Sequence, residues 1–535
     1  MKENLSNITV EVAEKYSTDV TEEDLANAWV DEYGVKYSAD RKRLLWAPEK
    51  IRSYKILKET KAICDDAFVD CFRMISLNIP EGVTSIGKCT FFGCSGLKKI
   101  NVEQGNTIYD SRENCNAVIR KCDNTLVVGC KNTIIPEGVT SIGDRAFSGC
   151  EGLTSLVIPE GVTSIDFEAF YGCSGLTSLH IPESVTSIGE RAFWGCSGLT
   201  SLHIPESVTS IGDYAFEGCS GLEKISVGQG NTIYDSRENC NAVIRKGDNI
   251  LIVGCKNTII PEGVTSIGDR AFSGCEDLTS LVIPEGVTSI GYRAFGDCIG
   301  LTSIHIPEGV TSIGDYAFFH CKGLTSVHIP EGVTSIGEVA FYACIGLTSV
   351  HIPEGITNIG DCAFYHCRGL TSVHIPESVT RIGNKAFCDC GSLTSVHIPE
   401  GVTNIGNCAF YLCRGLTSVH IPKGVTSIGY RAFYCCTGLT SFHIPEGVTS
   451  IGDEAFRGCS GLTSLCIPEG VTSIGDEAFS VCSGLTSLHI PESVTRIGFE
   501  AFDGCRSLTT IIIPKGSREK FKWMLRGHKD KLVEE

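Results

Sequence analysis

The amino-acid sequence predicts a repeat solenoid, mainly β with short helical turns, in which one unit is copied many times. Three observations support this fold class. A motif centred on phenylalanine, A-F-x-x-C, recurs with a period of 23 residues in 17 copies, from Phe68 to Phe502. The composition is skewed toward the same few residues, with 59 Gly and 29 Cys but only 3 Met in 535 residues. Because a unit of this size cannot bury an apolar face alone, stacked copies must share one continuous core.

Charge and composition argue against several classes of protein. Asp and Glu outnumber Lys and Arg by 63 to 45, and the net charge is −18. Proteins that bind nucleic acids need a basic face to displace counterions, so we expect no nucleic-acid partner. No run of about 18 apolar residues is present, so the sequence predicts no membrane insertion. The first residues also lack the charged-then-apolar pattern of a signal peptide.

The expected organisation has three parts. Residues 1–33 are a polar N-terminal segment, in which Thr21 and Asp24 indicate the start of a short helix. Residues 34–515 form the solenoid, and its first residues are expected to cover the first coil as a hairpin. Residues 516–535 have apolar residues at helical spacing and predict a helix that caps the last coil.

Each copy reads G-L-T-S-V-H-I-P-E-G-V-T-S-I-G-x-x-A-F-x-x-C-x with small variations. Apolar and polar residues alternate in S-V-H-I, as in a half-buried strand, and the next Pro ends that strand because it lacks an N–H. A second extended piece, V-T-S-I, ends at Gly in 15 of 17 copies, with Cys64 and Asp166 as departures. The Gly predicts a backbone position with positive φ. The A-F-x-x-C segment has the spacing of one helical turn, with Ala, Phe and Cys available to the interior.

Two insertions of 33 residues interrupt the period, at about 98–130 and 223–255. Their texts are nearly the same, beginning at Ile100 and at Ile225, so a larger unit of 125 residues was also duplicated.

The pattern L-T-S-h-x-I-P-x-x-V-T-x-I-G-x-x-A-F-x-x-C closely resembles the BspA-type leucine-rich repeat over roughly residues 50–515. The resemblance implies a leucine-rich-repeat-like curved rod with a concave parallel sheet. It also implies that the inserted text N-T-I-Y-D-S-R-E-N-C-N-A-V-I-R-K forms β-hairpins. Members of this family occur on bacterial and protist surfaces, where they act as adhesins or bind host and matrix proteins. The resemblance implies no catalytic residues.

Cysteine forms the first column of like residues along the solenoid. Of the 29 Cys, 17 lie three residues after the repeated Phe. Such a count suggests disulfides in a small secreted protein. Equivalent residues of stacked coils point in parallel, however, and pack as small hydrophobes, so we expect buried free thiols, which suit a reducing or anaerobic setting. A zinc site formed by Cys362, His366 and Cys367 is a weak alternative.

Histidine forms the second column, at the outward position of the S-V-H-I strand. Seven consecutive copies make up the candidate partner-binding residues, here called the histidine strip: His305, His328, His351, His374, His397, His420 and His443. One interpretation is a solvated column copied with its repeat. The other is a binding strip, since such solenoids commonly bind on the concave strand face. Metal binding is least favoured, because one straight column supplies a poor tetrahedron.

The histidine strip is also expected to respond to pH. Imidazoles at coil spacing disfavour being protonated together. The strip should therefore be largely neutral at pH 7, and partner binding should change between about pH 7 and 5.

Glutamate forms the third column, directly after the Pro that ends the strand, as at Glu308, Glu331, Glu354, Glu377 and Glu400. Like charges at coil spacing repel, so these side chains require exposure to water. An exposed turn is the simple interpretation, and a weak calcium-attracting edge is the alternative.

Catalytic motifs are absent. The sequence has no H-E-x-x-H, G-x-S-x-G, Walker A or strand-to-helix G-x-G-x-x-G pattern, and it predicts no enzyme, catalytic residue, metal or cofactor. The leading function is a non-catalytic binding scaffold that recognises a protein or glycan through its concave face, in an adhesin-like manner. The alternative is an intracellular protein–protein interaction scaffold, favoured by the thiols and by the missing signal peptide or anchor. The expected location is thus the cell surface or medium, with the cytoplasm as alternative, and the sequence does not indicate the oligomeric state.

Overall fold

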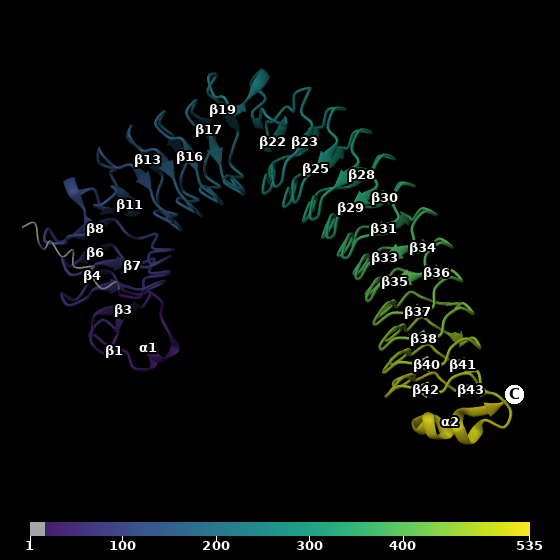
Figure 1. Cartoon of the computed structure of the whole chain (residues 1–535). Coiled ribbons are helices and arrows are strands. Elements are labelled where there is room, and N and C mark those ends of the chain that lie inside the picture. Colours follow the sequence, from purple (N-terminus) through teal and green to yellow (C-terminus); the bar gives the residue numbers. More distant parts are fainter. Residues whose placement is uncertain (1–15) are drawn as a thin grey trace, which may run out of the picture. The chain divides into compact units, whose positions relative to one another are not determined.

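The computed structural model describes residues 16–535, which wind in repeated coils (Figure 1). Each regular coil carries a longer strand, a shorter strand and hydrogen-bonded turns between them. Strands at the same position in successive coils pair in parallel and in register, as β26 (Ser303–His305) does with β28 (Ser326–His328). The predicted solenoid, mainly β with short turns, is confirmed. Residues 1–15 of the predicted polar segment lie outside the described residues.

The chain divides into two compact units. The first comprises residues up to Leu222 together with Val227–Ile233, and the second comprises Glu223–Ser226 and Tyr234–Glu535.

The first unit begins with α1 (Glu22–Ala26), β1 (Trp29–Val30), β2 (Lys36–Tyr37) and β3 (Arg43–Trp46). Its longer strands are β4 (Ser53–Lys55), β6 (Ser76–Ile79), β8 (Lys99–Val102), β13 (Ser155–Val157), β15 (Ser178–His180) and β17 (Ser201–Ile204). Its shorter strands are β5 (Ala62–Ile63), β7 (Ser85–Ile86), β12 (Ser141–Ile142), β14 (Ser164–Ile165), β16 (Ser187–Ile188) and β18 (Ser210–Ile211). Its insertion adds β9 (Tyr109–Asp110), the 3-10 helix η1 (Arg112–Asn114), β10 (Val118–Arg120) and β11 (Thr125–Val128).

The second insertion carries β20 (Tyr234–Asp235), η2 (Arg237–Asn239), β21 (Val243–Arg245) and β22 (Ile250–Val253), after β19 (Lys224–Val227). The longer strands of the second unit are β24 (Ser280–Val282), β26, β28, β30 (Ser349–His351), β32 (Ser372–His374), β34 (Ser395–His397), β36 (Ser418–His420), β39 (Ser464–Cys466), β41 (Ser487–His489) and β43 (Thr510–Ile513). Its shorter strands are β23 (Ser266–Ile267), β25 (Ser289–Ile290), β27 (Ser312–Ile313), β29 (Ser335–Ile336), β31 (Asn358–Ile359), β33 (Arg381–Ile382), β35 (Asn404–Ile405), β37 (Ser427–Ile428), β38 (Ser450–Ile451), β40 (Ser473–Ile474) and β42 (Arg496–Ile497). The chain ends with α2 (Arg518–Met524), η3 (Arg526–Lys531) and β44 (Leu532–Glu534).

The two insertions form antiparallel hairpins, as expected. In the first, β10 pairs antiparallel with both β9 and β11, and β11 then pairs parallel with β12 of the next coil. The second repeats this arrangement with β20, β21, β22 and β23. Each hairpin therefore supplies the strand on which the next run of regular coils stacks.

The N-terminal helix has the capping box that the sequence indicates. The Asp24 amide donates to Thr21 Oγ1 at 3.1 Å, and the Thr21 amide donates to the Asp24 carboxylate at 3.0 Å. The helix ends at Ala26, because the chain then turns into β1, which pairs antiparallel with β2. The pair β2–β3 continues into the first coil through the parallel pairing of β3 with β5.

The C-terminal segment combines a helix with a strand. Helix α2 buries Phe521, and Leu525 just beyond it is also buried. The chain then returns as β44, which pairs parallel with β43 and extends that sheet by one strand. The sequence-based expectation of a helix alone missed this strand, because a three-residue edge strand leaves no periodic pattern.

The core consists of columns of identical side chains. The repeated Phe rings stack face to face between coils, as for Phe341 and Phe364, whose centroids lie 5.4 Å apart at an interplanar angle of 1°. Both rings are fully buried, together with the Val, Ile, Leu and Ala of each coil. Every coil thus buries the apolar face of its neighbour, which is the reason a 23-residue unit can fold.

The glycine that closes each shorter strand was expected to need a positive φ, and this expectation is wrong. None of these glycines in the described residues has a positive φ. They are required instead by close approach between coils. A Cβ added to Gly337 would lie 2.4 Å from the Asp315 amide nitrogen and 2.5 Å from the Gly314 carbonyl carbon. No side chain fits there, whatever the backbone angles.

Positive φ occurs instead on both sides of the repeated Phe, as at Tyr316 and His320, both with φ of 58°. Because positive and negative φ alternate here, every second amide N–H points toward the next coil. The carbonyl of the same peptide group points toward the preceding coil. The resulting ladder, here called the turn ladder, has three rungs per coil, which in one coil join Tyr316, Phe318 and His320 to the carbonyls of Glu338, Ala340 and Tyr342. Its peptide dipoles are therefore aligned along the stack.

Candidate functional site

The histidine strip lies on the exposed face of the longer strands. Six of its seven His follow a Val or Ile that points toward the core, so the alternation of the strand turns the imidazole outward. The register places the first four residues of the strip directly opposite one another in successive strands: His305, His328, His351 and His374. A second run continues with His397 opposite His420.

Two pairs of imidazoles in the strip are stacked. The ring centroids of His351 and His374 lie 5.3 Å apart, and those of His397 and His420 lie 5.6 Å apart, with interplanar angles of 5° and 8°. Strand pairing stops between β32 and β34. The strip therefore contains two separate runs of paired strands.

His443 does not lie on a strand. Residues 440–446 form no strand, although their neighbours in the repeat do. Phe442 stands there in the place of the usual Val, Leu or Ile, and its ring makes edge contacts with Phe433 and Phe456 at 5.3 and 4.5 Å. The larger Phe442 ring distinguishes this coil from the adjacent coils, which keep their longer strands. Six of the seven predicted residues thus share the strand geometry.

The glutamate column, here called the acidic row, lies beside the strip. His420 Nε2 lies 3.1 Å from Glu400 Oε1, and this hydrogen bond lowers the pKa of the Glu400 carboxyl group. The same contact recurs at His351 with Glu331 (3.4 Å) and, more loosely, at His328, His397 and their carboxylates. Each carboxylate belongs to the coil before its imidazole. The side chains remain exposed, at 54% for His420 and 61% for Glu400.

This surface offers a regular set of hydrogen-bonding groups. Exposed Ser hydroxyls precede the imidazoles along each strand, as Ser349 precedes His351, and carboxylates flank them. A neutral imidazole carries one donor and one acceptor, and a carboxylate carries acceptors only. Such an array can bind peptide groups or sugar hydroxyls.

The column changes character toward its C-terminal end. Cys466 takes the position of the imidazole in β39, and its exposed thiol lies 3.6 Å from Nδ1 of His489 in β41. The next strand, β43, places Ile512 opposite His489.

The alternative metal sites find no support in the described residues. The structure brings no three His, Cys, Asp or Glu side chains together in a metal-binding arrangement within residues 16–535. Cys362, His366 and Cys367 do not converge. His366 Nδ1 instead lies 2.7 Å from an Asp389 oxygen, and the Cys367 thiol is buried in the core.

The cysteine column is buried, as expected. All 29 cysteines are free thiols, and the 17 of the column lie in the core. Each regular thiol donates to the carbonyl oxygen of the Phe one coil earlier, as Cys344 does to Phe318 at 3.2 Å. Burial raises the pKa of these thiols, to about 12 for Cys367.

One polar surface escaped the sequence-based reasoning. In the first unit, a hollow of about 620 Å³ lies over β4, β6 and β8, lined by Tyr33, Lys55, Asn78 and Asn101 among others. Lys55, Asn78 and Asn101 occupy the repeat position that carries His elsewhere. Asn101 Nδ2 donates to Asn78 Oδ1, and Tyr33 covers one side through an edge contact with Tyr54 at 5.8 Å. The replacement of His by Lys or Asn at this repeat position is the sequence signal that could have indicated this separate surface.

No helix within the described part of the chain is long and apolar enough to cross a bilayer.

Comparison with known proteins gives one family and several related folds. The model of the BspA type leucine rich repeat region matches residues 47–122, 127–242, 253–368, 357–483 and 403–525. A leucine-rich repeat protein from Bacteroides ovatus is 23% identical, with 94% of each chain covered and a TM-score of 0.34. A leucine rich cell surface protein from Faecalibacterium prausnitzii is 23% identical, with 93% of this chain and 97% of that chain covered and a TM-score of 0.30. A leucine-rich repeat protein from Eubacterium ventriosum is 24% identical, with coverage of 80% and 93% and a TM-score of 0.44. Comparison with curated proteins gives no match.

Proposed function

Because this chain belongs to the BspA-type leucine-rich repeat family, we propose that it is a non-catalytic scaffold that binds a protein or glycan partner in an adhesin-like manner. The contact surface is the histidine strip with the acidic row beside it. One observation carries the proposal: imidazoles that stand in register on β26, β28, β30 and β32 are all exposed. Stacked repeats commonly use such extended surfaces for binding.

The chemistry of the strip favours polar partners. Its Ser hydroxyls, imidazoles and carboxylates present donors and acceptors at the spacing of the coils, about 4.8 Å. Hydroxyl groups of a glycan or backbone groups of an extended peptide can bond to several coils at once. Weak contacts then add along the strip, in the way that multivalent binding gains affinity.

A test compares the intact chain with a variant that carries His328→Asn, His351→Asn, His374→Asn and His397→Asn. Both are applied to arrays of glycans and of extracellular-matrix proteins at pH 7 and pH 5. The parent chain should bind a defined subset with an affinity that changes between the two pH values. The variant should lose at least tenfold in affinity and most of the pH response. A matched control carries His320→Asn and His366→Asn, two imidazoles of the turn ladder, and should bind like the parent.

Equal binding by the parent and the strip variant, with the fold intact by circular dichroism, would contradict the proposal. The strip would then be a solvated column that was copied with its repeat.

The second candidate is an intracellular protein–protein interaction scaffold. The 29 free thiols favour it, including the exposed Cys122 and Cys466, because exposed thiols persist best in a reducing compartment. Protease treatment of intact cells distinguishes the two candidates. Loss of the chain's peptides from the cells supports the surface scaffold, and their full protection supports the intracellular one.

A further inference from the structure

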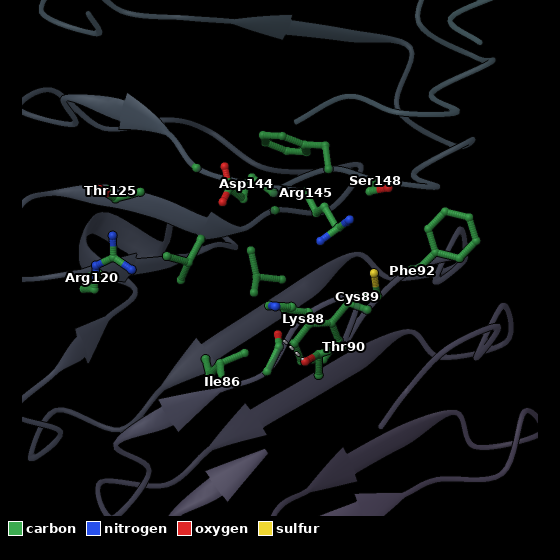
Figure 2. A pocket seen from close by; sticks show the side chains of 18 of the residues that line it. Ile86, Lys88, Cys89, Thr90, Phe92, Arg120, Thr125, Asp144, Arg145 and Ser148 are labelled. Carbon is green, nitrogen blue, oxygen red and sulfur yellow. Dashed lines mark hydrogen bonds between the residues drawn. The ribbon is translucent and has the colours of Figure 1, made fainter. Parts of the chain in front are cut away.

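A cavity of about 590 Å³ lies within the first unit, where the first insertion interrupts the regular stack (Figure 2). One wall is the coil that contains Phe91, with Ile86, Lys88 and Cys89, and the opposite wall carries Asp144 and Arg145. Its volume lies in the range of small-molecule sites, about 300–1,000 Å³. It is distant in sequence from the histidine strip and independent of the function proposed above.

The cavity exists because the inserted hairpin replaces the contact between two coils. In the stack of shorter strands, the Thr140 amide donates to the Asn124 carbonyl of the hairpin at 3.1 Å, instead of to the preceding coil. The Thr84 carbonyl has the position that accepts this bond in regular coils. The two coils remain close at their far edge, where a Cβ added to Gly149 would lie 2.5 Å from the Gly93 nitrogen. The space between them therefore widens away from this contact.

The turn ladder ends at this cavity with unused amides. In the preceding step, the amides of Asp66 and Phe68 donate to carbonyls of the Phe91 coil at 3.0 and 2.9 Å. The amides of Cys89 and Phe91 occupy the next step, and neither donates to an acceptor within residues 16–535. The carbonyl that would accept from Phe91, that of Ala146, accepts the Gly129 amide at 2.7 Å instead. Aligned peptide groups that end in unpaired N–H groups form a positive end that attracts anions.

The cationic side chains of the cavity add to this positive end. Arg145 and Arg120 line it, each held by an ion pair, with Glu168 at 2.7 Å and with Asp123 at 2.8 Å. Lys88 lines it from the turn-ladder side (Figure 2). Its ammonium group has no ion pair in the described part of the chain. One cation is thus available for a ligand without breaking an existing pair.

Part of the cavity lining is apolar, beside polar residues such as Thr90 and Asp144. The Phe91 ring stacks on Phe68 at 5.4 Å, but no ring contact joins it to Phe147 of the next regular coil in the described residues. The Phe147 ring is covered instead by Gly129, where an added Cβ would lie 2.0 Å from a ring carbon. Phe91 is half-buried, unlike the repeated Phe residues within the regular runs, and lines the cavity with the aliphatic Val127.

From these groups we infer that the cavity binds a small organic carboxylate with a flat or aliphatic body. The carboxylate accepts hydrogen bonds from the Cys89 and Phe91 amides and pairs with the Lys88 ammonium group. The apolar body lies on the open face of the Phe91 ring, against Val127. Burial of that ring face supplies the hydrophobic part of the affinity, and the unpaired donors supply the preference for an anion.

The test uses the full chain and isothermal titration calorimetry with phenylacetate, hexanoate and the neutral phenylacetamide. One or both acids should bind saturably with one site per chain, and phenylacetamide should bind at least tenfold more weakly than phenylacetate. Lys88→Met should weaken binding of the acids at least fivefold, while Lys322→Met, a matched change in the second unit, should leave it unchanged. Val127→Phe fills the cavity and should abolish binding.

Three results would overturn the inference: neither acid binds saturably, acid and amide bind equally, or Lys88→Met binds like the parent chain. Circular dichroism and thermal melting show whether Val127→Phe folds. Should it unfold, the comparison of Lys88→Met with Lys322→Met decides the question, because both positions are exposed.

Discussion

The Sγ atom of Cys321 lies 3.0 Å from the carbonyl oxygen of Phe295, one coil earlier. The same contact joins Cys344 to Phe318 at 3.2 Å and recurs along the column. A thiol in this position fills the space of a small apolar side chain and also donates a weak hydrogen bond. The regular part of the column is therefore a row of S–H donors directed at backbone carbonyls rather than at other sulfur atoms.

Replacement of one of these thiols should lower stability. Cys321→Ala removes the sulfur and its hydrogen bond from a fully buried site, and we expect a loss of about 1–2 kcal/mol in the free energy of unfolding. Urea denaturation followed by circular dichroism measures it. Cys466→Ala is the control, since this thiol is exposed and its loss should change stability by no more than about 0.5 kcal/mol. Equal effects of the two changes would contradict the role assigned to the column.

Thiol labelling should follow burial. In the native chain, iodoacetamide should modify Cys122 and Cys466 first, because these two thiols are exposed. The half-buried Cys89, Cys362, Cys408 and Cys435 should follow slowly. After unfolding without reductant, mass spectrometry should find all 29 thiols modified. Persistent unlabelled cysteines in the unfolded chain would show disulfides instead.

Stability should decrease at alkaline pH. Burial raises the pKa of the Cys71 and Cys367 thiols to about 12, against an ordinary value of 9.0. Well below pH 9 the folded and unfolded chains both keep these thiol protons, so the buried thiols contribute their full stabilisation to the folded chain. Above it, the unfolded chain loses protons that the folded chain retains, and folding becomes less favourable until the folded pKa is reached. The urea concentration at the midpoint of unfolding should therefore be lower at pH 10.5 than at pH 8.

The alkaline prediction has its own control. A variant with Cys321→Ala, Cys344→Ala and Cys367→Ala should show a shallower decrease of the midpoint with pH than the parent chain. The same slope in both proteins would assign the pH dependence to other groups.

The phenylalanine stack should be the most sensitive part of the core. Phe364 is fully buried and stacks on Phe341 at 5.4 Å and on Phe387 at 5.4 Å. Phe364→Ala should cost about 3–5 kcal/mol, since it removes the ring from both stacks and leaves a cavity. Differential scanning calorimetry measures the shift. Phe499→Ala removes a ring that is 71% exposed and should leave the melting temperature nearly unchanged.

The glycines that close the shorter strands should not tolerate a methyl group. Gly337→Ala places a Cβ within 2.5 Å of the backbone of the preceding coil, and we expect a loss of about 1–3 kcal/mol. Gly391→Ala is the matched control, because an added Cβ there meets nothing within 4 Å. Thermal melting of both variants tests the difference. Equal melting temperatures for Gly337→Ala and Gly391→Ala would contradict the close approach between coils as the reason for these glycines.

Much of the fold could be predicted from the sequence, because its information is local and repeated. Alternation in S-V-H-I indicated the longer strand, and the 23-residue period placed Phe, Cys and His in columns. The outward direction of His351 and the burial of Cys344 follow from these patterns alone. The capping box at Thr21 was visible for the same reason, since it involves residues only three apart.

The sequence by itself thus determined the period, the strands, the buried columns and the positions of the two insertions. Only the tertiary structure decided how close neighbouring coils lie, and several features depend on that distance. The close spacing leaves no room for a side chain at Gly337 and brings His420 within hydrogen-bond distance of Glu400. The wider spacing beside the first insertion leaves the amides of Cys89 and Phe91 unpaired. Residues of one coil meet those of the next only about 20 or more positions away in the chain, as His420 and Glu400 do, so no local pattern in the sequence records the contacts between coils.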